Sequence, residues 1–193
     1  MLTKMASTSF YQATVPTFKG IANSAVGFLS AAKEEQAKNS SLPSDQDLLN
    51  AQLGDMLPLR MQPILVGKFP LDGLTTLKLN GSAAPPNLDP SSFSSLDDVI
   101  NFFKQFAAVF DAVDEKTYNE SAGKSFDVTV AGKTMTMSNL AEYYNSFVIP
   151  NSYFHLNAMY MLLRSKGFTL GKGIYVKPFF TEQAKKDWAP LMG

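Results

Sequence analysis

Apolar residues recur at helical spacing in several long stretches of the chain. The first stretch has a three-to-four-residue period and carries Phe18, Ile21, Ala25, Phe28/Leu29 and Ala32. Such a period places the side chains on one face of a helix. Charged residues and the polar run 39–41 follow it. We therefore predict a first amphipathic helix that ends near Lys38.

Two later stretches show the same period with clear end signals. Ser94 or Ser95 caps the first of them, whose buried face comprises Val99, Phe102/Phe103, Phe106, Val109/Phe110 and Val113. A serine before an apolar period is a common helix start. The second stretch covers about 151–166 and stops at Gly167, a residue suited to a left-handed cap. The pattern predicts a main helix in each place.

The region between the first two of these helices is interrupted. Pro43-Ser44-Asp45 is typical of a helix start, and a helical pattern then runs from about Gln46 toward Leu77. Glycines and prolines break it at Gly54, Pro58, Pro63, Gly67 and Pro70. Proline cannot donate a backbone hydrogen bond within a helix. We expect a short helix, a bend, a kinked continuation, and then a loop over 80–92.

A β-hairpin is predicted before the last main helix. Apolar residues alternate with polar ones in 126–130 and again in 134–137, around a turn that contains Gly132. Ser138-Asn139 then caps a short helix that we expect to stop before Pro150. The elements amount to a mainly all-α fold, an up-down four-helix bundle with this hairpin between helices 3 and 4.

The length favours one domain. We assign 1–193 to a single helical-bundle domain, with a core of 8–173 and a C-terminal extension of 174–193 that packs on the body through its aromatic residues. Tyr175, Phe179, Phe180 and Trp188 carry that inference. Nothing in the pattern repeats.

Composition and charge narrow the function classes. Seventeen basic residues balance seventeen acidic ones, which argues against nucleic-acid and anionic-membrane partners. No apolar run is long enough to span a membrane, and the segment Met1–Thr8 has no apolar region typical of a secretory signal. The chain has no cysteine, which is compatible with the cytosol, and we expect a cytoplasmic protein. Fifteen Phe and nine Met supply either a core or an apolar pocket.

Two stretches of sequence resemble a known family. They are Leu49-Asn-Ala-Gln-Leu-Gly-Asp-Met-Leu-Pro-Leu59 with Gln62, and Pro150-Asn-Ser-Tyr-Phe-His155 continuing through 162–172. Together with Tyr11–Pro16 and the hairpin turn 130–133, they look like a bacterial and fungal domain-of-unknown-function family related to the DinB bundles. The match covers roughly 8–173.

The resemblance implies a four-helix bundle and commonly a homodimer, without an established chemistry for the family. This sequence departs from the family pattern at 173–176, in its extra tail, and in the less polar surroundings of Lys68. Related DinB bundles often hold a metal through three histidines. With one histidine, this chain cannot form such a site, and we expect neither metal nor cofactor.

His155 is the first candidate for chemistry. It shares a helix face with Met159 and Leu162, so its imidazole is expected inside the fold or in a cleft, where it can serve as an acid or base. Asp55 is the second candidate, because a helical reading places it on one face with Leu59 and Gln62. The catalytic hypothesis is that Asp55 orients His155. The structural alternative is a buried histidine and an inter-helix tether.

Further residues are candidates for binding a substrate. Hydrogen-bonding groups or adaptable apolar groups are supplied by Gln62, Tyr144, Asn151, Tyr160, Met159 and Arg60. Ordinary core packing of the same residues is the alternative, as it is for Met135, Met137 and Met161.

Three functions are consistent with these features. The first is a cofactor-free enzyme that isomerises, dehydrates or cyclises a hydrophobic small molecule, by acid/base or shape-based catalysis. Natural-product pathways are suggested by resemblance alone. The second is a non-catalytic small-molecule-binding or dimeric scaffold protein. The third, a metal-dependent transferase, is disfavoured by the missing histidines.

Overall fold

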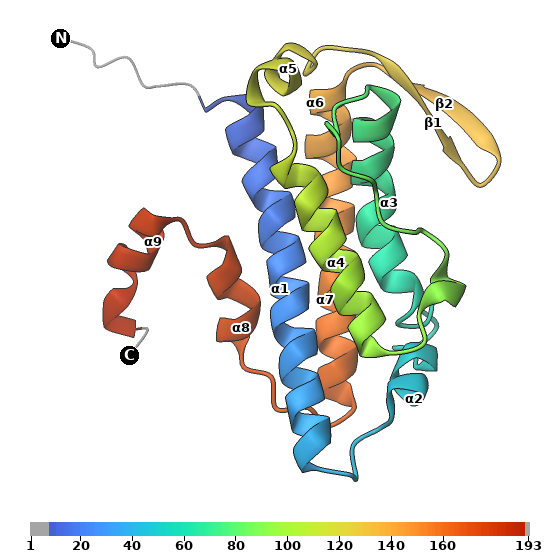
Figure 1. Cartoon of the computed structure of the whole chain (residues 1–193), viewed down its shortest axis with the longest axis vertical. Coiled ribbons are helices and arrows are strands. Elements are labelled where there is room, and N and C mark those ends of the chain that lie inside the picture. Colours follow the sequence, from blue (N-terminus) through green and yellow to red (C-terminus); the bar gives the residue numbers. More distant parts are fainter. Residues whose placement is uncertain (1–7, 192–193) are drawn as a thin grey trace.

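Four long helices form a bundle: α1 (Phe10–Lys38), α3 (Met61–Thr76), α4 (Leu96–Asp111) and α7 (Ile149–Ser165) (Figure 1). The computed structural model describes residues 8–191. Residues 1–7 and 192–193 lie outside that range. The first of these segments carries most of the stretch in which we predicted no secretory signal, and the second is the end of the predicted C-terminal extension. The predicted mainly helical fold is confirmed.

The direction of the helices differs from a strictly alternating bundle. Lys33 near the end of α1 pairs with Asp97 at the start of α4, so these two helices are antiparallel. The start of α4 also lies beside α2 (Asp45–Asn50), where Leu96 N donates to Asp45 Oδ2 at 2.9 Å. Since α2 precedes α3, α3 and α4 start at the same end and run in parallel (Figure 1). The loop between them is long enough for this crossover, because 19 residues reach about 60 Å when extended and α4 is about 24 Å long.

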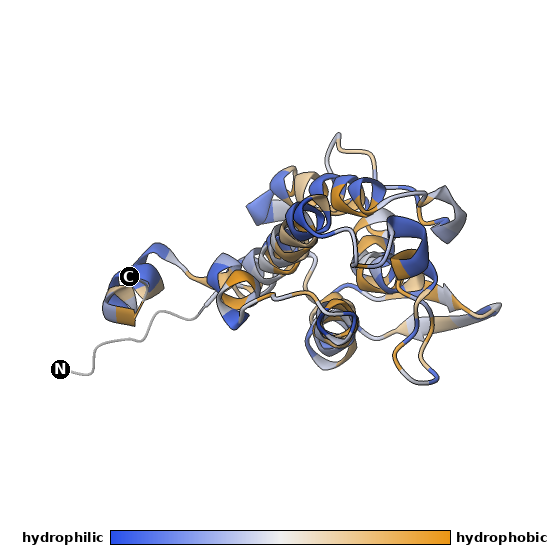
Figure 2. Cartoon of the chain, turned by 90° about the horizontal axis from the view of Figure 1, so that it is seen from below, coloured by the Kyte–Doolittle hydropathy of each residue, from blue (hydrophilic) through white to orange (hydrophobic). Residues whose placement is uncertain are grey.

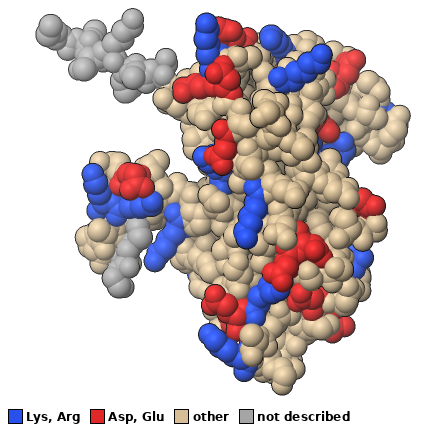
Figure 3. All heavy atoms as spheres, in the orientation of Figure 1, with Lys and Arg blue, Asp and Glu red and all other residues tan. Residues whose placement is uncertain are grey.

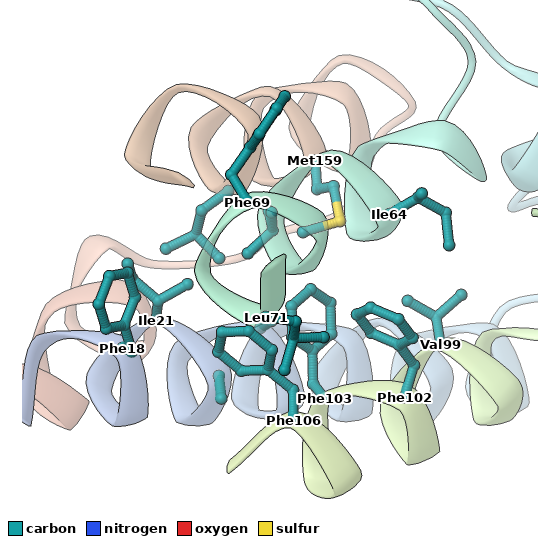
Figure 4. Close-up of a cluster of buried hydrophobic side chains, with 14 of the residues drawn as sticks. Phe18, Ile21, Ile64, Phe69, Leu71, Val99, Phe102, Phe103, Phe106 and Met159 are labelled. Atoms are coloured by element: carbon teal, nitrogen blue, oxygen red, sulfur yellow. The ribbon is translucent and has the colours of Figure 1, made fainter. Parts of the chain in front are cut away.

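The core lies between the facing sides of these four helices. Figure 4 shows Phe18 and Ile21 from α1 meeting a row of phenylalanines from α4 and apolar side chains from α3, with Met159 from α7. Phe18 stacks on Phe110 with ring centroids 4.8 Å apart. In Figure 2 the helices turn their hydrophobic sides inward and their polar sides outward. The apolar face predicted for each of α1 and α4 is thus the face that is buried.

Serine caps start several helices. Ser95 accepts from Asp98 N, and the Asp98 side chain accepts from Ser95 N in return, which is the capping box expected for α4. Ser44 and Asp47 form the same arrangement at α2. Of the two predicted caps for α4, Ser95 is the one used.

The helix predicted over 46–77 is more interrupted than expected. α2 ends at Asn50 and α3 begins only at Met61. Gly54 adopts a φ of +60°, a left-handed turn that a helix cannot contain, and Pro58 follows it. Pro63 lies in the first turn of α3, where no backbone donor is needed, and Pro70 lies inside the helix.

The hairpin consists of β1 (Phe126–Val130) and β2 (Lys133–Met137), which pair antiparallel with Val128 opposite Met135. It follows the short α5 (Glu115–Glu120) and, in Figure 1, extends from the top of the bundle beyond α3. The crossover loop after α3 includes a single 3-10 turn, η1 (Pro90–Ser92). The predicted hairpin is therefore present, with the register that its alternation implies.

We expected the helix after the hairpin to stop before Pro150, but the helix continues past this residue. α6 (Leu140–Tyr143) continues through a π-helical segment, η2 (Tyr144–Val148), directly into α7. At this junction Ile149 N donates to Tyr144 O, five residues back. The wider π turn and the position of Pro150 in the first turn of α7 allow the helix to pass through the proline.

The C-terminal extension, predicted over 174–193, begins within α8 (Lys172–Val176), which packs on α1 together with η3 (Lys177–Phe179). The Phe179 ring lies directly over Gly20, where a Cβ would come within 2.5 Å of it. Tyr175 packs edge-on against Tyr160 with centroids 5.4 Å apart. Beyond Phe180, α9 (Glu182–Asp187) and η4 (Ala189–Leu191) project from the bundle, and Trp188 is exposed (Figure 1).

Charged side chains are scattered over the face of the molecule on which α1 and α4 lie, with both signs intermixed (Figure 3). Lys19 pairs with Asp111 across these two helices. None of the helices within residues 8–191 is long and apolar enough to cross a membrane.

Candidate functional site

A pocket of about 350 Å³ lies between the hairpin, α3 and the segment that leads into α7. We call it the hairpin pocket. Its wall is made by eleven residues: Phe69, Val128, Val130, Met135, Met137, Ser138, Asn139, Glu142, Tyr143, Ser146 and Phe147. The volume falls at the lower end of the range typical of small-molecule sites, about 300–1,000 Å³.

The apolar wall follows from the strand pattern. Because side chains alternate between the faces of a strand, Val128 and Val130 lie on the same face, and Met135, which pairs with Val128, joins them there. On the opposite side, the Phe69 ring from α3 packs edge-on against Phe147 with centroids 4.9 Å apart. Methionine adapts its shape easily, so such a wall tolerates different apolar ligands.

The polar side chains of the pocket all come from one segment, 138–146. Asn139 caps α6 by accepting from Glu142 N at 2.7 Å. One turn later, Ser146 Oγ donates to Glu142 Oε1 at 2.5 Å. The spacing of these residues along a helix places them on one edge of the pocket. The hairpin pocket therefore has one polar edge and otherwise apolar walls.

Tyr143 belongs to the wall and is buried. Burial raises the pKa of its phenol well above the ordinary value, and the nearby Asp72 carboxylate raises it further. The hydroxyl donates to Phe69 O at 3.4 Å. Tyr143 is thus a neutral hydrogen-bond donor at neutral pH, and its donor is turned toward the backbone of α3.

His155 lies outside the hairpin pocket, at the other end of the α3–α7 contact. Its Nδ1 is 2.7 Å from Gln62 Oε1, and Gln62 Nε2 donates to Leu57 O at 2.6 Å. Because the amide oxygen can only accept, Nδ1 carries the proton. Burial lowers the pKa of His155 to about 4, so the ring is neutral at neutral pH.

The predicted pairing of Asp55 with His155 is not found. Asp55 lies in the exposed turn between α2 and α3 rather than on a helix face, because α2 already ends at Asn50 and Gly54 turns the chain in a left-handed conformation. Gln62 occupies the position beside the imidazole. Arg60 lies at the start of α3, where its backbone N donates to Leu49 O at 3.1 Å.

The other predicted substrate-binding residues contact the protein itself. Tyr144 OH donates to Pro70 O at 2.6 Å, and Asn151 Nδ2 donates to Leu65 O at 3.0 Å. Tyr160 OH donates to Leu170 O at 2.9 Å. Met159 is fully buried in the core. These residues tether neighbouring segments, which is the packing alternative considered for them above.

Ser152 belongs to the same set of tethers and escaped the sequence analysis. Pro70 has no N–H, so the carbonyl of Val66, four residues earlier, lacks its helical partner. Ser152 Oγ donates to Val66 O at 3.2 Å and supplies the missing bond. The signal was the proline within an apolar helix, which implies a donor from a neighbouring element.

Replacing Ser152 by alanine is expected to lower the free energy of unfolding by about 1–3 kcal/mol, because it leaves a buried carbonyl without a partner. Ser165→Ala on the same helix is the control, since Ser165 is exposed and bonds within its own turn. Urea denaturation measures both. An equal effect of the two substitutions would show that the bond to Val66 contributes nothing.

The pKa of His155 predicts a dependence of stability on pH. The unfolded chain has a histidine pKa near 6.5, so it takes up a proton before the folded chain does as the pH falls. The contribution of the neutral ring is complete above about pH 6.5 and is lost toward pH 4. With allowance for the water-exposed part of the ring, we expect a loss of about 1–2 kcal/mol that His155→Gln lacks.

Because the chain has one histidine, NMR titration of its ring signal measures this pKa without assignment. The expected midpoint is about 4. A midpoint near 6.5 would mean that the imidazole is solvated and that Gln62 does not hold it.

Comparison with known proteins places the chain in a family. The sequence profile described as Domain of unknown function (DUF1993) matches residues 10–176. A solved structure with a similar fold is the crystal structure of a DinB family member protein from Shewanella denitrificans. It has a TM-score of 0.68 and 23% sequence identity, covering 86% of this chain and 90% of that chain. The comparison with curated proteins gave no match.

Proposed function

This chain belongs to the DUF1993 family, with the fold of a DinB family member, and we propose that it binds a small apolar molecule in the hairpin pocket. The observation that carries this proposal is a pocket of about 350 Å³ whose walls are mainly Val, Met and Phe side chains. Burial of apolar ligand surface supplies the main driving force in such a site.

Binding fits the pocket better than catalysis does. The acid and base groups at its wall are Glu142 and Tyr143, and the phenol of Tyr143 already donates to the backbone. His155 does not line the pocket, and its lowered pKa makes it a weak base. Isomerisation, dehydration or cyclisation of a hydrophobic molecule stays a prediction, which turnover by a His155→Ala variant would test.

A neutral fluorophore tests binding directly. We expect N-phenyl-1-naphthylamine to gain fluorescence on addition of the protein and to saturate at one molecule per chain. Val130→Trp fills the pocket from the strand and should reduce the affinity at least about tenfold, since the indole occupies space that the ligand needs. Thr129→Trp places the same ring on the opposite strand face and should leave the affinity within about twofold.

The proposal fails if the fluorophore does not bind, or if Thr129→Trp weakens binding as much as Val130→Trp. Circular dichroism melting of both variants establishes that the fold is retained. The two substitutions differ only in the strand face they use, so a general loss of hairpin structure would affect both alike.

Self-association is a second proposal, and it rests on a different surface. Phe147, Phe154 and Met161 are 45%, 58% and 47% exposed and lie seven residues apart, so they form one stripe along η2 and α7. The sequence from 143 to 163 contains no Asp, Glu, Lys or Arg. A second copy of this chain can therefore pack against the stripe without repulsion between like charges.

The exposed area suits the centre of a dimer interface. The three side chains together expose about 300 Å² of apolar surface, judged from the size of large side chains. A stable interface buries about 800 Å² on each partner, with an apolar centre and a polar rim. Light scattering should show a dimer that Phe154→Glu dissociates and that Gln105→Glu, on the surface of α4, does not. A monomer at all concentrations up to about 200 μM would overturn this proposal.

A further inference from the structure

The hairpin pocket carries an uneven distribution of charge. Among the described residues that line it, Glu142 is the only acidic residue, and neither lysine nor arginine is among them. Lys68, which directly precedes Phe69 in α3, pairs with Asp72 at 2.7 Å. The charge that a ligand meets inside the pocket is therefore negative, which disfavours carboxylates and phosphates and favours a cation.

The Glu142 carboxylate is held in place. Its Oε1 accepts from Ser146 Oγ, and its backbone is fixed by the Asn139 cap, so the side chain lies along the polar edge of the pocket. An ionised carboxylate has about four acceptor sites on its two oxygens, and Ser146 uses one of them. The remaining sites can accept from an ammonium group.

The apolar wall beside this edge also favours a cation. Phe69, Tyr143 and Phe147 form an aromatic cluster, in which the rings of Tyr143 and Phe147 have centroids 6.1 Å apart. The faces of aromatic rings attract cations. The Lys68 ammonium lies 5.9 Å from the centroid of the Phe69 ring, so one ring of this cluster already makes a cation–π contact within the protein.

We propose that the hairpin pocket binds a small hydrophobic amine, whose ammonium group pairs with Glu142 and whose aromatic or branched alkyl group lies against the hairpin. This assignment rests on the proposed binding function. The pocket volume of about 350 Å³ is sufficient for a small amine with one to three rings.

Three probes that share a phenyl group and a short chain test the assignment: 2-phenylethylamine, 2-phenylethanol and 3-phenylpropanoate. Ligand-detected NMR titration gives the Kd of each. We expect the amine to bind about three- to fivefold more tightly than the alcohol, and the carboxylate more weakly than either, because an ion pair with the exposed Glu142 carboxylate adds to the shared apolar contact. The preference for the amine should decrease as the salt concentration rises.

Glu142→Gln is the informative variant, since its amide oxygen still accepts from Ser146. It should lower the affinity for the amine to that for the alcohol and leave the alcohol within about twofold. Glu34→Gln is the control, because Glu34 is exposed near the C-terminal end of α1 and does not line the pocket. This variant should keep the preference for the amine over the alcohol.

Two other results would overturn the amine assignment, and they differ in what they imply for the proposed function. Equal binding of the amine and the alcohol, or an amine preference that survives in E142Q, would overturn the amine assignment while leaving apolar binding in place. A lack of binding by all three probes would overturn the amine assignment and the proposed function together.

Discussion

Replacing Phe110 by alanine is expected to lower the free energy of unfolding by about 3–5 kcal/mol. Phe110 is fully buried in α4, stacks on Phe18 of α1 at 4.8 Å, and lies 5.0 Å from Phe106. Its removal leaves a cavity between two helices whose other side chains cannot all move in to fill it. Since small domains are stable by about 5–15 kcal/mol, this is a large fraction of the total.

Urea denaturation followed by circular dichroism measures this loss. Trp188→Ala removes a larger ring from an exposed position on the C-terminal extension and should change the stability by no more than about 0.5 kcal/mol. Comparable losses for the two variants would contradict the packing of α1 against α4 described above.

Replacing Gly73 by valine is expected to cost about 3 kcal/mol. A Cβ at this position of α3 would lie 2.8 Å from Tyr144 Cε1 and 3.1 Å from Leu140 Cδ1. Tyr144 cannot give way easily, because it is fully buried and its hydroxyl is bonded to Pro70 O at 2.6 Å. The substitution therefore forces α3 away from Tyr144 in η2 and Leu140 in α6.

Thermal unfolding compares this variant with Gly123→Val. A Cβ at Gly123 meets no atom within 4 Å, so that variant should unfold close to the original temperature. A Gly73→Val protein as stable as Gly123→Val would mean that α3 and η2 are not in close contact.

The sequence pattern was sufficient for the regular elements. The apolar periods of α1 and α4, the Ser95 cap and the hairpin alternation all reflect local rules, and the structure shows them where they were expected. Prolines were harder to interpret. Pro150 fits inside a continuous helix because η2 widens the turn before it, and Pro70 fits because Ser152 replaces the missing donor.

The site was less accessible to sequence reasoning. The hairpin pocket joins Phe69 to Val128 and Phe147, which are far apart in the chain and meet only through the packing of α3 against the hairpin and η2. The helical reading of the α2–α3 turn placed Asp55 beside His155, whereas the turn at Gly54 exposes it. Met135 and Met137 were considered for an apolar pocket, and these two line it, while Met159 lies in the core.

The most direct test of binding in the hairpin pocket is an NMR titration of protein labelled at its methionine methyl groups. On addition of N-phenyl-1-naphthylamine, the signals of Met135 and Met137 should shift in a saturable manner. The signals of Met159, in the core, and of the His155 ring should stay in place. Shifts confined to Met159 or His155, or no shift at Met135 and Met137, would contradict the assignment of this pocket as the ligand site.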